Sequence, residues 1–202
     1  MLAIIDYGVG NLFSLVSSLK SIGVDAVITS DPQIIENADR LILPGVGAFG
    51  DASEKLATSG LEEIIKNAVK KGTPLMGICL GMQLLFEKSF EYGEHKGLGL
   101  LKGNVIGMEG TIPKELKIPH IGWNSLKFTK NSPIFKYINE GDCVYFVHSF
   151  YAVDCEDSLI ATAEYGKDLT AAVQQDNVYG CQFHPEKSGS VGLKILKAFS
   201  EV

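Results

Sequence analysis

Residues 74–83 read PLMGICLGMQ, and this stretch decides the fold. An apolar run typical of a buried β-strand covers residues 74–79, and a helical pattern begins at Leu80 and continues to residue 87. Gly77 and Gly81 stand two positions before and two positions after Cys79. Glycines at these positions permit a sharp turn from strand to helix, because they have no Cβ to clash. The sequence therefore predicts that Cys79 lies on a strand–turn–helix elbow above the carboxyl edge of a sheet, where a helix N-terminus favours a thiolate.

Apolar runs and helical patterns alternate on both sides of this stretch. Strand-like runs also cover residues 2–6, 24–29 and 40–43, and helical patterns cover residues 11–22 and 53–71. Such alternation is typical of a parallel sheet covered by helices on both faces.

The second half of the chain has a different pattern. Its short strand-like runs cover residues 97–108, 124–128, 144–150, 159–164, 171–175 and 178–183, before a helical pattern at 188–199. We therefore expect an α/β fold with a mostly parallel central sheet, helices on both faces and antiparallel β additions in the second half. No break in composition separates two parts, so we expect a single domain over residues 1–202.

Composition and charge exclude several classes of protein. The chain has 18 basic and 24 acidic residues, a net charge of −6, which argues against a nucleic-acid binder that neutralises phosphates. It has no apolar stretch long enough to span a bilayer and no signal-peptide pattern at its N-terminus, so we expect a cytoplasmic protein without membrane contact. The four cysteines lack zinc-binding spacing, and no metal site is predicted. We expect Cys143 and Cys181 to pack within β runs and Cys155 to be exposed.

Residues 183–186, FHPE, form a second candidate motif. Pro185 favours an extended backbone at His184, and in an extended chain residues two apart project to the same side. Glu186 can therefore hold one tautomer of His184, which leaves the other ring nitrogen free to exchange a proton with Cys79. The alternative for this motif is that His184 and Glu186 form a solvated pair in a turn before a helix. The alternative for Cys79 is a small buried cysteine with no chemical role.

Two glycine-rich loops were considered as further sites. Residues 44–47, PGVG, follow a strand-like run and can present backbone N–H groups to an oxyanion, although a simple turn is the better explanation of this motif by itself. Residues 7–11, YGVGN, resemble the start of a dinucleotide-binding fingerprint, but Phe13 stands where the third glycine would be. We therefore expect no cofactor.

Taken together, PGVG, GICLGMQ and FHPE, in this order and spacing, resemble the class I (triad) glutamine amidotransferases, whose fold is flavodoxin-like. The resemblance covers essentially the whole chain. The segments DYGVGN (6–11), HIGWN (120–124), YFVHS (145–149) and EKS (186–188) are similar, more narrowly, to the glutaminase subunits of imidazole glycerol phosphate synthases from histidine biosynthesis.

This resemblance implies a role for each matching residue. Cys79 would attack the side-chain amide of L-glutamine, with His184 as acid and base and Glu186 as its orienter. The N–H groups of Val46 and Leu80 would form the oxyanion hole. Residues matching the glutamine pocket of the family are Gly47, Gln83, Glu91, Ser149 and Phe150. Because Phe150 stands where relatives are expected to have tyrosine, we expect Phe150 to contact glutamine through its backbone.

The resemblance also implies a heterodimer. Ammonia would pass to a (β/α)₈ barrel synthase subunit, which would form imidazole glycerol phosphate and aminoimidazole carboxamide ribotide. The residues that match the interface are Asn11, Trp123, Tyr145 and Lys187. Two alternatives remain open. The first is a glutaminase subunit of an anthranilate or aminodeoxychorismate synthase, and residues 120–124 argue against it. The second is a peptidase-like or non-catalytic relative; a non-catalytic one should lack Gln83 or Glu186, and both are present.

Overall fold

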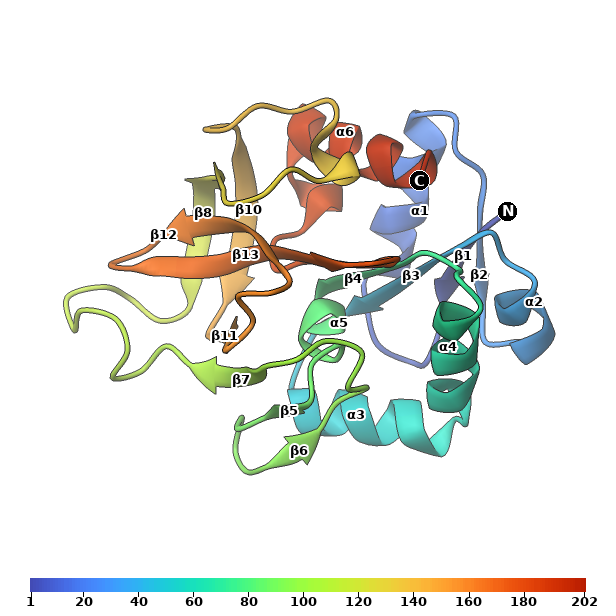
Figure 1. Ribbon diagram of the computed structural model, residues 1–202, viewed down its shortest axis with the longest axis horizontal. Helices are drawn as coiled ribbons and strands as arrows, with labels where there is room; N and C mark the ends of the chain where they lie inside the picture. Colours follow the sequence, from blue (N-terminus) through green and yellow to red (C-terminus); the bar gives the residue numbers. More distant parts are fainter.

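The computed structural model describes residues 1–202 and is built around one large twisted sheet (Figure 1). Its eight strands lie in the order β2 (Ala26–Thr29), β1 (Leu2–Ile5), β3 (Arg40–Gly45), β4 (Leu75–Cys79), β14 (Val178–Cys181), β13 (Asp168–Gln175), β12 (Leu159–Glu164) and β9 (Lys127–Phe128). The first five strands pair in parallel, and the last three are added antiparallel. The predicted mostly parallel α/β sheet is confirmed.

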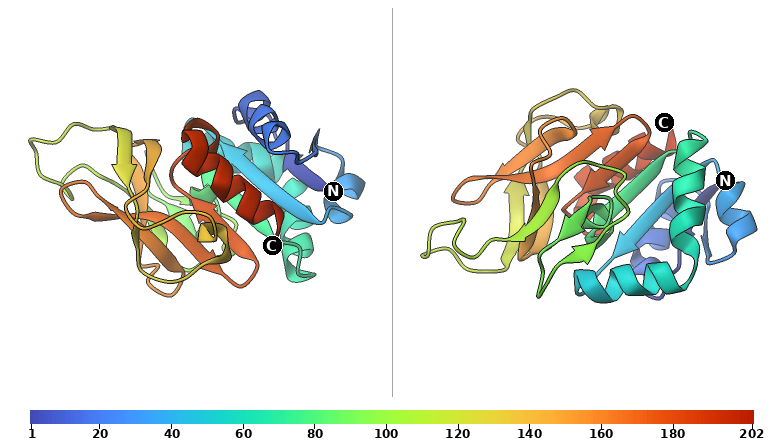
Figure 2. Two further views of the ribbon diagram at one scale, coloured as in Figure 1. Left: turned by 90° about the horizontal axis from the view of Figure 1, so that it is seen from above. Right: turned by 60° about the horizontal axis from the view of Figure 1, so that its bottom comes forward.

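Helices cover both faces of this sheet (Figure 2). One face carries α1 (Leu12–Ser21) and α6 (Gly189–Ser200), and the other carries α2 (Pro32–Glu36), α3 (Phe49–Thr58) and α4 (Leu61–Lys70). Alternate residues of β1 belong to two separate apolar clusters, with Leu2 and Ile4 on the α1 side and Ala3 and Ile5 on the α4 side. The continuous apolar runs in the sequence arise because these strands are buried on both faces.

The helical pattern at 53–71 was predicted as one helix, and the structure divides it into α3 and α4. The break is at Gly60, whose φ of 74° lies in the left-handed region that ends a helix and that glycine adopts without strain. The short helix α2 was not predicted; it begins with Asp31 as its cap, whose side chain accepts from the N–H of Gln33, and with Pro32 in its first turn. The helix predicted at 80–87 is also shorter, since α5 covers only Leu80–Gln83.

Only part of the second half joins the large sheet. A two-stranded antiparallel sheet contains β8 (His120–Ser125) and β10 (Cys143–His148). A four-stranded sheet contains β11 (Phe150–Val153), β7 (Asn104–Gly107), β5 (Lys88–Ser89) and β6 (His95–Lys96). The strand-like run at 97–108 is a strand only at its end, and the run at 178–183 forms β14, which pairs in parallel with β4 rather than antiparallel.

Two expectations for the cysteines were wrong. Cys143 is exposed, because it begins β10 at the end of a two-stranded sheet that has no further strand to cover it. Cys155 is buried, with its sulfur 3.7 Å from the hydroxyl of Thr170, because the chain turns inward after Asp154, whose φ is 55°. Cys181 is buried in β14 as expected. None of the helices combines the length and the apolar character needed to cross a bilayer.

The carboxyl ends of three parallel strands meet at one edge of the sheet. Gly45 at the end of β3 pairs with Cys79 at the end of β4, and Ile78 pairs with Cys181 at the end of β14. The segments that follow these strands therefore begin side by side. They are the PGVG loop, the GICLGMQ elbow and the FHPE segment.

Candidate active site

Cys79 occupies a strained position between β4 and α5. Its φ of 55° and ψ of −113° are uncommon for a residue with a side chain, and strain of this kind gathers at functional sites. The turn brings α5 so close to the sheet that a Cβ on Gly77 would lie 2.6 Å from the carbonyl oxygen of Gly81. A Cβ on Gly45 would lie 2.6 Å from the backbone nitrogen of Gly81. The glycines are therefore required by close backbone approach, as well as by the turn.

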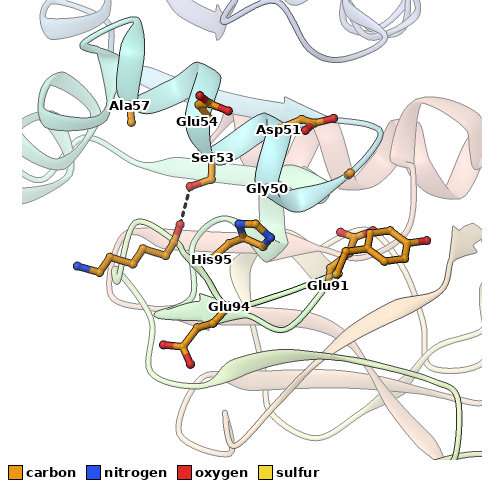
Figure 3. A pocket seen from close by; sticks show the side chains of 11 residues that line it. Gly50, Asp51, Ser53, Glu54, Ala57, Glu91, Glu94 and His95 are labelled. Atoms are coloured by element: carbon orange, nitrogen blue, oxygen red, sulfur yellow. Dashed lines mark hydrogen bonds between the residues drawn. The ribbon is translucent and has the colours of Figure 1, made fainter.

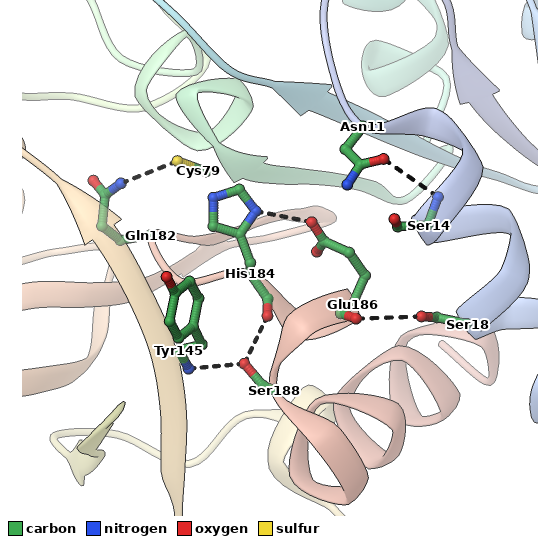
Figure 4. A network of polar contacts seen from close by, with 9 residues as sticks. All are labelled: Asn11, Ser14, Ser18, Cys79, Tyr145, Gln182, His184, Glu186 and Ser188. Carbon is green, nitrogen blue, oxygen red and sulfur yellow. Dashed lines mark hydrogen bonds and ion pairs between the residues drawn. The ribbon is translucent and has the colours of Figure 1, made fainter. Parts of the chain in front are cut away.

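His184 reaches the same place from β14. Its backbone is extended, with φ −100° and ψ 98°, and Nδ1 lies 2.8 Å from Oε1 of Glu186 in the short helix η2 (Pro185–Lys187). Ser188 fixes this segment, since its hydroxyl donates to the carbonyl of His184 and accepts from the N–H of Tyr145, as Figure 4 shows. The side chains of His184 and Glu186 are 3% and 4% exposed, so water does not compete for their contact.

The surroundings of His184 favour its charged form. Burial lowers the pKa of this imidazole, but hydrogen bonding and charge interaction with Cys79 and Glu186 outweigh burial and raise the pKa to about 9. The ring nitrogen that does not face Glu186 points toward the Cys79 sulfur (Figure 4). At neutral pH the ring is therefore an imidazolium, hydrogen-bonded on one side to Glu186 and directed on the other side at the sulfur of Cys79.

We expect the pKa of His184 to fall below 9 in Cys79→Ser and in Glu186→Gln, because each change removes one of the two groups that stabilise the imidazolium. The measurement is an NMR titration of the ring in the full chain. The raised pKa also stabilises the folded state fully below the unfolded value, near pH 6.5, and this contribution is lost as the pH rises through about 9. A His184 ring that titrates identically in all three proteins would contradict this description.

Beside Cys79 lies a cavity of about 310 Å³. The residues proposed from the sequence for the nucleophile, the base, the oxyanion hole and the glutamine pocket all line it, although they come from distant parts of the chain. They are Val46, Gly47, Cys79, Leu80, Gln83, Glu91, Ser149, Phe150 and His184. The cavity is also lined by Tyr92, Pro119, Val147, His148 and Lys187.

Two polar side chains of the cavity wall are held by backbone groups. Gln83 donates from Nε2 to the carbonyl of Phe150, at 3.1 Å, so Phe150 contributes its backbone to the wall. Glu91 is 8% exposed, and its Oε2 accepts from the N–H of Phe49 at 2.7 Å. The Ala48 cap of α3 has no side-chain hydrogen bond, so Glu91 supplies this cap from a distant loop.

Pro44 and Gly45 of the PGVG segment end β3, and Val46 and Gly47 continue it as a loop that lines the cavity. Val46 is 42% exposed, and Gly47 has a φ of 95°, which a residue with a side chain rarely adopts. Leu80 is the first residue of α5, so its N–H has no acceptor within the helix. The hydroxyl of Tyr7 donates to the carbonyl of Pro44 at 2.8 Å and anchors the start of the loop.

Sequence reasoning missed three residues near the site. Tyr7 lies in the glycine-rich segment that was rejected as a cofactor motif, and burial, followed by the charge of Cys79, raises its pKa. Gln182 places Nε2 3.9 Å from the Cys79 sulfur, and its position just before FHPE was the only signal available. His148 is buried at the end of β10, and it also lines the cavity.

The four residues expected at an interface lie around the rim of the site. Trp123 is 57% exposed and stands edge-on to Tyr145, with ring centroids 6.1 Å apart. Lys187 lines the main cavity, and Asn11 caps α1 and lines a small adjoining cavity together with Val46 and Glu186. Trp123 and Tyr145 thus lie side by side, and Lys187 and Asn11 line two cavities that share Val46 and His184.

A second cavity, of about 550 Å³, adjoins the first and shares Glu91 and Tyr92 with it (Figure 3). Four of its eleven lining residues are acidic, Asp51, Glu54, Glu91 and Glu94, and the others include Ser53, His95 and Lys96. No group of three or more histidine, cysteine, aspartate or glutamate side chains is arranged to hold a metal ion.

Comparison with known proteins agrees with this geometry. The model of the family described as "Glutamine amidotransferase class-I" matches residues 3–201. The chain is 56% identical over 203 residues to "Imidazole glycerol phosphate synthase subunit HisH" of Caldanaerobacter subterraneus, covering 100% of this chain and 98% of that protein. It is 50% identical over 204 residues to the protein of the same name from Wolinella succinogenes, covering 100% of both. A crystal structure of a glutamine amidotransferase superposes with a TM-score of 0.76 at 20% identity over 98% of this chain and 97% of that one, which shows a shared fold.

Proposed function

The chain belongs to the class I glutamine amidotransferase family, and from this premise we propose that it acts as the glutaminase subunit of an imidazole glycerol phosphate synthase. One observation carries the proposal: Cys79, His184 and Glu186 meet at the edge of a cavity whose wall holds Gln83 and Glu91. The family and the relatives named above support this function over that of a subunit of an anthranilate or aminodeoxychorismate synthase.

In the proposed reaction Cys79 attacks the side-chain carboxamide carbon of L-glutamine. The His184 imidazolium gives its proton to the departing nitrogen, so ammonia leaves and a glutamyl thioester remains on Cys79. Neutral His184 then takes a proton from water, and the resulting hydroxide attacks the thioester. Glutamate is released and Cys79 regains its thiolate. Glu186 keeps the Nδ1 side of the ring occupied throughout, so that only the other nitrogen exchanges protons.

The oxyanion that forms at each step requires N–H donors, and we assign this role to Leu80 and Val46. The N–H of Leu80 is available at the start of α5. Val46 is exposed on a loop next to Gly47, where a peptide plane can turn over at low cost. Removing one such donor typically lowers the rate by ~10²–10³, so the conformation of this loop can act as a switch.

We further propose that a (β/α)₈ barrel synthase subunit docks over Asn11, Trp123, Tyr145 and Lys187 and receives the ammonia. The exposed Trp123 beside Tyr145 is the kind of aromatic pair that anchors protein interfaces. Lys187 lines the cavity and Asn11 lines a small cavity beside it, so a partner docked over them would lie close to the site where ammonia is released. It would also contact the rim that includes the Val46 loop.

The test compares glutamate release by the isolated chain and by its complex with the synthase subunit. We expect low activity alone and a gain of about 10²-fold or more when the partner and its phosphoribosyl ligand are both present, because a correctly turned Val46 amide is worth that much. The partner without ligand serves as the control. High activity of the isolated chain, unchanged by the partner, would refute the coupling, and a partner that uses chorismate would refute the choice of synthase.

A further inference from the structure

Two buried histidines, of which only His148 lines the cavity, take no part in the triad. His148, at the end of β10, is 6% exposed, and His120, directly opposite on β8, is 3% exposed. Nδ1 of His120 lies 3.0 Å from Nε2 of His148. The His120 ring is held between Phe146 and Tyr165, with centroids 4.9 Å and 4.1 Å away. Two imidazoles are costly to bury unless every ring nitrogen has a partner, and here each of them does.

The partners determine which way the hydrogens point. A carbonyl oxygen only accepts, so His148 must carry its proton on Nδ1, which lies 2.9 Å from the carbonyl of Phe150. In the neutral ring Nε2 is then an acceptor, and His120 must donate to it from Nδ1. This leaves Nε2 of His120 as an acceptor facing Nδ2 of Asn124 at 3.4 Å.

Asn124 cannot reverse the direction. Its Oδ1 accepts from the N–H of Ser125 at 2.8 Å, and its Nδ2 donates to the carbonyl of Glu164 at 2.7 Å. Turning the amide over would place like groups against both partners. The chain of hydrogen bonds therefore runs one way, from Asn124 through His120 and His148 to the carbonyl of Phe150.

Both rings are neutral at physiological pH. Burial lowers the pKa of His148 to about 3, and the hydrogen bond to Phe150 only partly opposes it, while the nearby His120 and His184 lower it further. Burial also lowers the pKa of His120. A cation at His148 would moreover face the imidazolium of His184, so the site keeps one charged histidine and two neutral ones.

The chain of hydrogen bonds ends at the carbonyl of Phe150, and this carbonyl also holds the side chain of Gln83 in the cavity wall. The carbonyl of Phe150 also accepts from Nε2 of Gln83 at 3.1 Å, and the same Nε2 donates to Oε1 of Gln182 at 3.1 Å. Both hydrogens of the Gln83 amide are thus engaged, and reversing the amide would set its oxygen against two acceptors. Oε1 of Gln83 is consequently the polar atom that this side chain offers to a ligand in the cavity.

We propose that His148 and His120 are positioning residues for glutamine binding: they fix the carbonyl of Phe150, which in turn fixes the Gln83 amide with its oxygen available to a donor group of the substrate. The inference rests on the proposed glutaminase function for the identity of the ligand. The direction of the hydrogen-bond chain stands on the contacts alone.

A matched pair of variants tests the role of His148. His148→Asn keeps an N–H donor near the position of Nδ1 and can still serve Phe150, whereas His148→Gln places its amide near Nε2 and loses that bond. In the complex with the synthase subunit, we expect the KM for glutamine to rise about 5- to 10-fold in His148→Gln, the worth of about one hydrogen bond, with kcat changed less than about 3-fold. His148→Asn should keep its KM within about 3-fold of wild type. Equal KM values for the Gln variant and wild type, or equal losses in both variants, would overturn the proposal.

A spectroscopic measurement on the unmodified full chain needs no activity and no variant. Nitrogen-15 NMR of the histidine rings should show His148 and His120 neutral at pH 7, each with its proton on Nδ1. Protonation at Nε2 of either ring, or an imidazolium at either position, would overturn the proposal. Absence of glutaminase activity in the wild-type complex would instead refute the proposed function, and the ring spectra would still decide the hydrogen-bond chain.

Discussion

Cys79→Ala is expected to abolish glutaminase turnover, with a loss of about 10⁴-fold or more, even with the synthase partner present. The covalent route is closed when the sulfur is removed, and His184 alone has no nucleophile to assist. The oxyanion donors and the glutamine pocket remain, so the variant should still bind glutamine. Glutamate release by the complex measures the loss, and glutamine binding by calorimetry shows that the pocket is intact.

Cys143→Ala provides the matched control, since it makes the same change at an exposed cysteine that does not line the cavity. Its turnover should equal that of wild type. Mass spectrometry after treatment with a glutamine-like electrophile should find an adduct at residue 79 in wild type and in Cys143→Ala, and none there in Cys79→Ala. Retention of a tenth or more of wild-type turnover by Cys79→Ala would contradict the assignment of the nucleophile.

The elbow could be predicted from the sequence because its cause is local. Gly77, Cys79 and Gly81 lie within five positions of one another, and the clash that Gly77 avoids is with the backbone of Gly81 in the same turn. The clash that Gly81 avoids, with the backbone of Leu43 in β3, is not local and could not be foreseen. The approach of His184 to Glu186 was predictable for the same reason, since an extended backbone before Pro185 brings residues two apart to one side. Their approach to Cys79 followed from a general rule of parallel sheets, in which carboxyl ends share an edge.

Other features could not be predicted because they depend on pairing between distant segments. Glu91 caps α3 through the N–H of Phe49, 42 positions away, and no periodic pattern announces this contact. His120 and His148 meet only because β8 and β10 pair in one register, and a shift by one residue would place the two side chains on opposite faces of the strand pair. The break at Gly60 was missed for a different reason: apolar residues continue with helical spacing across it, so periodicity alone suggested a single helix.

Gly81→Ala is expected to destabilise the protein and to disable the site together. A Cβ at this position would overlap the carbonyl oxygen of Leu43 and lie 3.1 Å from the carbonyl carbon of Pro44. Both neighbours are backbone atoms of β3, so no side chain can move aside, and α5 must shift away from the sheet. Alanine is favoured over glycine within a helix by about 1 kcal/mol, which would give the opposite sign. We expect the clash to dominate and to lower the free energy of unfolding by about 3 kcal/mol or more.

The same shift would move Cys79 and the N–H of Leu80 relative to His184, and a displacement of about 1 Å can lower turnover by about 10²-fold. Urea denaturation of the full chain measures the stability, and glutamate release by the complex measures the activity. Gly107→Ala is the control for stability: Gly107 also lies in regular structure, but a Cβ there would meet nothing closer than 3.5 Å. Helix propensity alone predicts a higher free energy of unfolding for Gly81→Ala. That result would show that the close approach of α5 to β3 does not require a glycine at this position.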